Sequence, residues 1–198
     1  MRIKIVKIAS YGSNILKVNK YDFYTRSSRQ EIDPSVDTPI SYELQYKKHS
    51  YKKAYCSELE RAIASARYLS KKVVGIKELN EIKFDLKKLL SREEYMKYGS
   101  KLVRERFVNA FIEDNLLEPR KSVMTRVDKL IDRFSKSIDD EFVCVSHSFF
   151  MKVLEASIDG CDLSRSPELI RGYIDVDQKT YKFGEGFIIN VQSTRGEI

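Results

Sequence analysis

The chain contains few of the residues that hold very small or fibrous proteins together. Only 3 of its 198 residues are cysteines, and Cys56, Cys144 and Cys161 are widely spaced, with no Cys-x-x-Cys pair. This spacing excludes a disulfide scaffold, argues against a cysteine-rich zinc site and fits a reducing compartment. Glycine and proline are also scarce, at 8 and 4 residues, so the chain is neither collagen-like nor of low complexity. We expect one domain, 1–198, built around a single core.

Long apolar runs are missing as well. The longest, such as Phe142–Val145 and Phe187–Val191, fall far short of the roughly 20 residues that span a bilayer. The first ten residues alternate charged and apolar side chains, whereas a signal peptide has an unbroken apolar stretch after its basic residues. We therefore expect a cytoplasmic protein that does not enter a membrane.

The chain is basic, and its charge is unevenly distributed. It carries 36 Lys and Arg against 29 Asp and Glu, a formal net charge of +7. Residues 1–75 hold 15 of the basic and 7 of the acidic side chains, a net of +8, and the remainder has a net of −1. Such an excess favours an anionic partner, which can be nucleic acid, a membrane surface or a phosphorylated small molecule.

Apolar periodicity predicts strands that alternate with helices. Strands are expected at Ile3–Ile8, Lys53–Cys56, Lys72–Ile76, Glu141–Ser146 and Gly186–Val191. Helical spacing is found over 57–69, 92–115, 120–137 and 149–158, with a short helix near Ile40–Tyr46. Ser57 and Glu60 have the spacing of a capping box at the start of the first long helix. The alternation indicates a three-layer α/β/α sandwich with a mostly parallel sheet.

Three loops lie where a predicted strand ends. They are Ser10–Ser13, Ser57–Arg61 and Ser146–Ser148. In an open α/β sheet, ligands bind at this edge. A phosphate there gains from the unpaired N–H groups and the dipole at a helix N-terminus. The sequence therefore favours a pocket for a phosphate group or another oxyanion.

Three segments follow one another along the chain: 54–66 (AYCSELERAIASA), 79–84 (LNEIKF) and 142–148 (FVCVSHS). In their sequence and their order they resemble the histidine phosphatase superfamily, also called the phosphoglycerate mutase-like fold. The resemblance implies a phosphate site formed by Arg61, His147, Ser57, Ser10 and Gly12. It also implies that His147 and Glu81 are catalytic and that Glu81 donates a proton to the leaving group. It runs from residue 1 to about 192, includes a helix that contains Arg126, and implies variable insertions near 14–50 and 84–122. It implies no metal and no cofactor.

The first segment departs from the family pattern. Members of the family open with a strand that ends in Arg-His-Gly, whose His is the phosphorylated nucleophile. Here the strand is followed by Ser10-Tyr11-Gly12. Gly12 is kept, but Tyr11 stands at the position of the nucleophile and Ser10 at that of a phosphate-binding Arg. The 50 residues from Tyr11 to Arg61 match the spacing in compact members of the family.

These two replacements remove functions that the family mechanism needs. A phenol has a pKa near 10 and is mostly protonated at neutral pH. Phosphotyrosine is also a stable ester, so attack by Tyr11 would stall turnover. Loss of the Arg removes a bidentate clamp on the phosphate oxygens. We therefore expect a protein that binds a phosphorylated small molecule or phosphoprotein, with lost or severely impaired phosphomonoesterase or mutase activity.

Several alternatives remain open at this stage. His49 is one of only two histidines, and as a displaced nucleophile it would make the chain an active phosphatase. Arg26 or Arg29 can replace the missing Arg. Glu78 competes with Glu81 for the place in the pocket.

A function of another class also remains open. Residues 46–53 interleave tyrosines with four lysines, Lys47, Lys48, Lys52 and Lys53. This pattern is compatible with binding to nucleic-acid phosphates and bases, or to another anionic partner. The sequence leaves the oligomeric state open, a dimer included.

Overall fold

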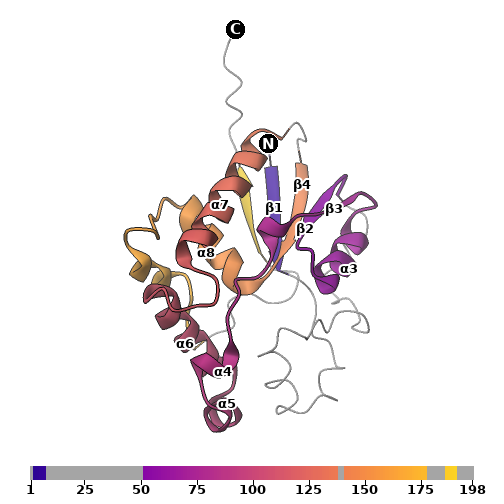
Figure 1. Cartoon of the computed structure of the whole chain (residues 1–198). Coiled ribbons are helices and arrows are strands. Elements are labelled where there is room, and N and C mark those ends of the chain that lie inside the picture. The colour runs from indigo at the N-terminus through magenta and orange to yellow at the C-terminus, as the bar shows by residue number, and fades with distance from the viewer. Residues whose placement is uncertain (1, 8–50, 138–140, 178–185, 191–198) are drawn as a thin grey trace.

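A computed structural model describes residues 2–7, 51–137, 141–177 and 186–190 (Figure 1). At its centre is a five-stranded sheet in the order β3-β2-β4-β1-β5. The first four strands in that order run parallel, and β5 is antiparallel to β1. The strands are β1 (Arg2–Lys7), β2 (Ala54–Cys56), β3 (Val73–Gly75), β4 (Glu141–Ser146) and β5 (Gly186–Asn190).

Helices cover the sheet on both sides, which confirms the predicted α/β fold. Helices α7 and α8 lie on one side and α3 on the other, while α4, α5 and α6 extend beyond one end of the sheet (Figure 1). The α-helices are α3 (Glu60–Leu69), α4 (Leu86–Leu89), α5 (Arg92–Tyr98), α6 (Ser100–Ile112), α7 (Arg120–Ser135) and α8 (Ser148–Ile158). Two short 3-10 helices are η2 (Lys77–Leu79) and η3 (Pro167–Gly172). Within the described ranges, no helix combines the length and apolar character needed to cross a membrane.

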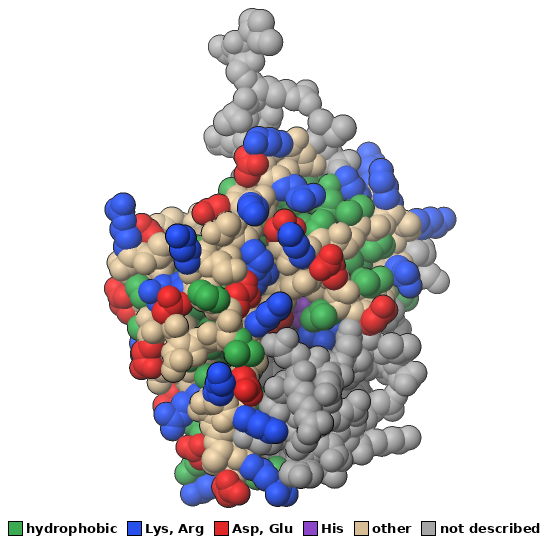
Figure 2. All heavy atoms as spheres, viewed as in Figure 1, with side chains coloured by type: hydrophobic (Ala, Val, Ile, Leu, Met, Phe, Trp, Pro, Cys, Tyr) green, Lys and Arg blue, Asp and Glu red, His purple; other side chains and the backbone are tan. Residues whose placement is uncertain are grey.

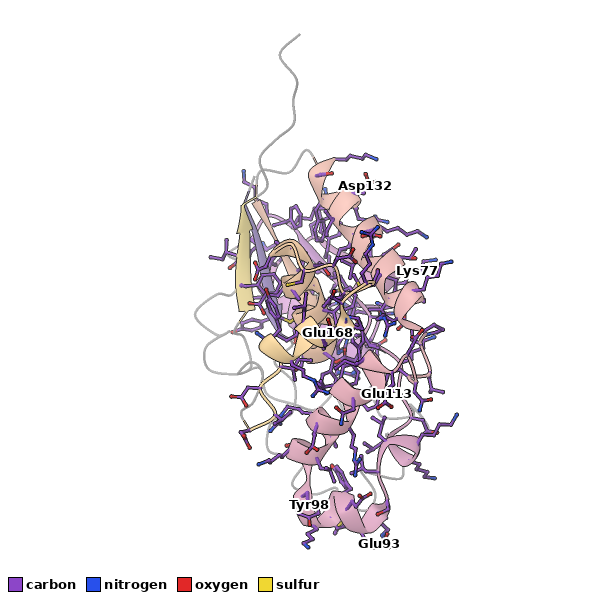
Figure 3. All side chains as sticks on the ribbon, turned by 90° about the vertical axis from the view of Figure 1, so that its left-hand side faces the viewer. Lys77, Glu93, Tyr98, Glu113, Asp132 and Glu168 are labelled. Carbon is purple, nitrogen blue, oxygen red and sulfur yellow. The ribbon has the colours of Figure 1, made fainter. Side chains whose placement is uncertain are left out.

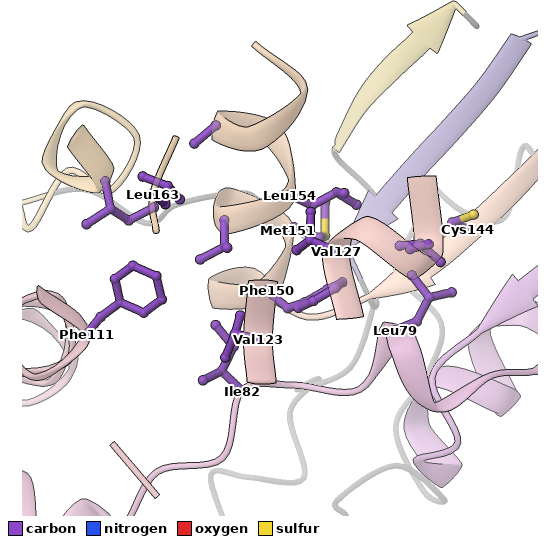
Figure 4. Packing of buried hydrophobic residues seen from close by; sticks show 14 of the residues in the cluster. Leu79, Ile82, Phe111, Val123, Val127, Cys144, Phe150, Met151, Leu154 and Leu163 are labelled. Carbon is purple, nitrogen blue, oxygen red and sulfur yellow. The ribbon is translucent and has the colours of Figure 1, made fainter. Parts of the chain in front are cut away.

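The two faces of the sheet build two apolar clusters. Successive side chains of a strand point to opposite faces, so Phe142 and Cys144 of β4 join the larger cluster, whose packing against α7 and α8 is drawn in Figure 4. Val143 and Val145 join the smaller cluster beneath α3. All four side chains are fully buried. A central parallel strand is covered on both faces, which explains the unbroken apolar sequence of β4.

The structure corrects the helix predicted over 92–115. It is two helices, because Gly99 between α5 and α6 has φ +61° and ψ −142°, a conformation that is practically reserved for glycine. Helix α5 buries none of its residues. Glu93 and Tyr98 mark its place at the far end of the molecule in Figure 3. The chain turns again after Ile112, where Asp114 has φ +57°.

The predicted capping box at Ser57 is wrong. Helix α3 begins only at Glu60, and Leu59 stands at its N-cap without a side-chain hydrogen bond. The Ser57 hydroxyl instead donates to Asn80 and accepts from the Leu59 amide. The hydroxyl therefore links the loop between β2 and α3 to the segment after η2. The short segments η2, α4 and η3 were not predicted, and the helix expected near residues 40–46 lies outside the described residues.

Candidate functional site

Loops at the carboxyl ends of β2 and β4 lie next to each other. The Ser57 amide donates to the Val145 carbonyl (3.0 Å), which joins the end of β2 to β4. The Ser146 hydroxyl donates to the carbonyl of Leu79, the last residue of η2, at 2.7 Å, which attaches the end of η2 to the same edge. As expected for parallel strands, this edge gathers residues that are far apart in the sequence.

His147 lies at the centre of this group. It directly follows β4 and is 5% exposed. Its Nδ1 is 3.3 Å from Nη2 of Arg61, and its Nε2 is 2.9 Å from Oγ of the fully buried Ser57. Arg61 is half-buried in the first turn of α3. The structure thus brings together three of the residues that sequence analysis named.

Asn80 completes the arrangement, and sequence analysis did not name it. Its Oδ1 accepts hydrogen bonds from the Ser57 hydroxyl (3.0 Å) and the Glu58 amide (2.9 Å). Its Nδ2 donates to a carboxylate oxygen of Glu58 (3.2 Å). Its hydrogen-bond partners lie 22 and 23 residues away, so local sequence spacing does not reveal them. The position beside Glu81 is the one feature of the sequence that could have pointed to Asn80.

Glu81 and Glu78 occupy different positions. The Glu81 carboxylate accepts hydrogen bonds from the amides of Phe150 (2.9 Å) and Ile82 (3.0 Å), and a longer one from Phe149 (3.4 Å). Burial raises the pKa of the Glu81 carboxyl, while the three backbone donors and the Arg61 charge lower it less. Glu78 is buried in η2. Of the two glutamates, Glu81 therefore sits by the first turn of α8, within the electrostatic reach of Arg61.

Arg126 of α7 braces the segment that carries Asn80 and Glu81. Its Nη1 donates to the carbonyls of Glu78 (3.0 Å) and Asn80 (2.8 Å). Its Nε and Nη2 bind both carboxylate oxygens of Glu118, at 2.8 and 2.9 Å, and its guanidinium stacks 4.6 Å from the ring centre of Phe150. This bidentate pair is mostly buried, with side chains 15% and 10% exposed. Arg126 therefore holds the backbone of the segment that carries Asn80 and Glu81.

Two cysteines near the site belong to the core. Cys56 and Cys144 are fully buried in neighbouring strands. Burial raises the pKa of the Cys56 thiol to about 11 and that of Cys144 well above its usual value. Because the thiolate is the reactive form, both are packing residues at neutral pH. Among the described residues, no group of three or more His, Cys, Asp or Glu side chains is placed to hold a metal ion.

Several predicted site residues lie outside the described residues: Ser10, Tyr11, Gly12, Arg26, Arg29, Lys47, Lys48 and His49. Of the basic segment, Lys52 is exposed, and Nζ of Lys53 lies 4.6 Å from the ring centre of Tyr55. On the face drawn in Figure 2, the described Lys and Arg side chains are interspersed with Asp and Glu.

The mostly parallel sheet defines an α/β protein, and the Arg61–His147 pair lies at the edge where its parallel strands end. The sequence model of the histidine phosphatase superfamily (branch 1) matches residues 43–188, so the chain belongs to this superfamily. No curated protein matches the sequence.

Solved structures share the fold. The alpha-ribazole phosphatase of Shigella flexneri is 21% identical with a TM-score of 0.54, and the match covers 87% of this chain and 85% of that one. YhfR of Bacillus stearothermophilus is 12% identical with a TM-score of 0.52, covering 85% and 83%. A mutant phosphoserine phosphatase of Entamoeba histolytica, in complex with phosphoserine, is 16% identical with a TM-score of 0.50, covering 94% and 88%.

Proposed function

We propose that this chain binds a phosphate group, on a phosphorylated small molecule or a phosphoprotein, and has lost or severely impaired phosphomonoesterase activity. The observation that carries the proposal is the pairing of Arg61 with His147 at the ends of β2 and β4, in a chain whose first strand is followed by Ser10-Tyr11-Gly12.

The chemistry of this pair favours an oxyanion. A guanidinium presents five N–H donors in a planar fork that matches two oxygens of a phosphate. The imidazole of His147 contacts one nitrogen of this fork and so helps to hold the guanidinium in place. Both groups are at least half-buried, where a charge-assisted hydrogen bond is stronger than in water. A phosphorylated ligand is therefore a better match for this pair than a neutral or cationic one.

The proposed loss of hydrolysis depends on residues 10–12. The match to the superfamily begins at residue 43 and so leaves out this segment. Tyr11 in place of a nucleophilic His would give a stable phosphotyrosine ester instead of an intermediate that water cleaves. Of the two histidines in the chain, His147 has its imidazole committed to Ser57 and Arg61.

Calorimetric titration tests the binding. Inorganic phosphate or tungstate is expected to bind the wild-type chain, and Arg61→Ala should reduce the affinity at least tenfold, because a charged hydrogen bond to a phosphate contributes about 1.5–3 kcal/mol. Arg67→Ala is the matched control, since Arg67 is an exposed residue in the last turn of the same helix. If neither anion binds, or if Arg61→Ala binds as tightly as the wild type, the proposed site is wrong.

Hydrolysis of p-nitrophenyl phosphate tests the proposed loss of phosphomonoesterase activity. We expect no turnover above that of the buffer. Steady hydrolysis that His147→Ala abolishes would instead establish an active phosphatase with a displaced nucleophile, and His49→Ala would then show whether His49 is that group.

A further inference from the structure

The orientation of the Asn80 side-chain amide is set by two partners that each have a single hydrogen-bonding role. The backbone N–H of Glu58 can only donate, and it meets Oδ1 at 2.9 Å. The Glu58 carboxylate can only accept when it is ionised, and it meets Nδ2 at 3.2 Å. The oxygen and nitrogen of the amide are thereby distinguished by their surroundings.

This orientation determines where the Ser57 proton goes. An amide oxygen has no proton to give, so the contact of 3.0 Å between Asn80 Oδ1 and Ser57 Oγ requires the hydroxyl to donate. The Leu59 amide donates to the same hydroxyl oxygen (3.2 Å). Ser57 therefore has no second proton to offer His147, although its oxygen can still accept one more hydrogen bond.

The position of the proton on the His147 ring then follows from the contacts of its two nitrogens. Its Nε2 lies 2.9 Å from an oxygen that can only accept, so Nε2 carries a proton. Its Nδ1 faces Nη2 of Arg61 at 3.3 Å, and a guanidinium nitrogen can only donate, so Nδ1 is without a proton. The contacts with Ser57 and Arg61 are both satisfied by one state, the neutral imidazole protonated at Nε2.

We propose that Asn80 is a positioning residue of the site: acting through Ser57, it holds His147 in the neutral Nε2–H form and turns the Nδ1 edge toward Arg61. The role of Asn80 does not depend on the proposed function. Only its consequence does, which is that a bound phosphate meets an imidazole of fixed orientation. Asn80 itself does not touch the anion.

The direction of the Ser57 hydrogen bond also decides whether Ser57 can act as a nucleophile. A serine becomes a nucleophile when a neighbouring base accepts its proton. Here the Ser57 proton is directed at an amide oxygen, which is not a base, and Nε2 of His147 is already protonated. Ser57 consequently does not replace the nucleophile that the chain lacks at Tyr11, in spite of its 2.9 Å contact with a histidine.

Nitrogen-15 NMR of the imidazole tests the proposal, because the ¹⁵N shifts distinguish the two neutral forms. His49→Gln leaves His147 as the only histidine, and pH 8 keeps an ordinary imidazole, with a pKa of about 6.5, neutral. In this background we expect Nε2–H. Arg61→Ala should leave that form in place, because Asn80 and Ser57 still require it.

Adding a change at Asn80 to Arg61→Ala gives the decisive comparison. With Asn80→Ala, the Ser57 hydroxyl is released and can donate to His147, so the shifts should move toward a mixture with the Nδ1–H form. With Asn80→Asp, an acceptor oxygen remains and the Nε2–H form should persist. The inference is overturned if the Asn80→Ala pair keeps the Nε2–H form alone, or if Arg61→Ala by itself abolishes it. Dispersed amide spectra show that each variant is folded.

Phosphate titration of Asn80→Ala, with Arg61 intact, provides the functional readout. We expect affinity to fall about five- to tenfold, the usual effect of one lost neutral hydrogen bond. If the wild-type chain binds no phosphate while the ¹⁵N shifts follow the pattern above, the proposed function fails and the role of Asn80 stands. If phosphate binds and the shifts do not respond to Asn80, only the role of Asn80 fails.

Discussion

At the scale of single residues, the Glu81 carboxyl combines stabilising and destabilising contributions. Burial raises its pKa from the ordinary 4.5, and three backbone donors with the Arg61 charge compensate only in part. A raised pKa in the folded state means that the folded chain binds this proton more tightly than the unfolded chain does. Stability from this group is therefore complete below about pH 4.5 and is lost as the pH rises through the folded-state pKa.

Replacing Glu81 by Gln tests this balance. The free energy of unfolding of the wild type, relative to Glu81→Gln, should decrease from pH 4 to pH 8, by about 1.4 kcal/mol for each unit of the raised pKa. Urea titrations at several pH values measure the difference. Glu113→Gln, at an exposed position after α6, is the matched control. A relative stability that rises with pH would contradict the sign of the shift.

Ser10 and Tyr11 allow a test by gain of function. The double change Ser10→Arg with Tyr11→His restores the Arg and the nucleophile of the family motif. If the remainder of the site is intact, it should hydrolyse p-nitrophenyl phosphate measurably, and adding His147→Ala should remove that activity. A well-folded double variant without activity would show that the site has diverged beyond this loop.

At the scale of elements, Arg126 joins α7 to the segment that carries Asn80 and Glu81. Removing the Arg126 guanidinium from this mostly buried ion pair leaves the Glu118 carboxylate without its charged partner. It also takes one donor from the carbonyls of Glu78 and Asn80. We expect Arg126→Ala to reduce the free energy of unfolding by about 3 kcal/mol. Chemical denaturation measures this loss, and Arg133→Ala, an exposed residue in the last turn of the same helix, should change stability by less than about 0.5 kcal/mol. If both changes reduce the free energy of unfolding equally, Arg126 does not hold α7 to this segment.

The elements that sequence analysis predicted best are those with strong apolar periodicity. Helix α7 has Val123, Val127, Leu130 and Phe134 buried along one face, and β4 is apolar on both faces, so pattern alone located them. The break at Gly99 was missed because the apolar spacing continues through it, although the backbone cannot. Asn80 was missed for another reason. Its role depends on hydrogen-bond partners that are distant in the sequence, and residue spacing does not predict such contacts.

At the scale of the whole molecule, the excess of positive charge is much larger than the charge that the site itself contributes. Residues 1–75 carry a net of +8, and most of them lie outside the described residues. The Arg61–His147 pair contributes a single formal charge. A general attraction for anions and a specific phosphate site are therefore separable properties, and a measurement on the whole fold can distinguish them.

Ligand-linked stability is that measurement. A ligand that binds only the folded chain raises the free energy of unfolding by mass action, by about 2.7 kcal/mol at 100 times its Kd. Phosphate also stabilises folded proteins generally by exclusion from their surface, so the comparison must be made between variants in the same buffer. We expect phosphate to raise the thermal midpoint of the wild type and of Arg67→Ala by more than that of Arg61→Ala. Equal increases in all three would mean that the basic chain responds to phosphate without a site at Arg61.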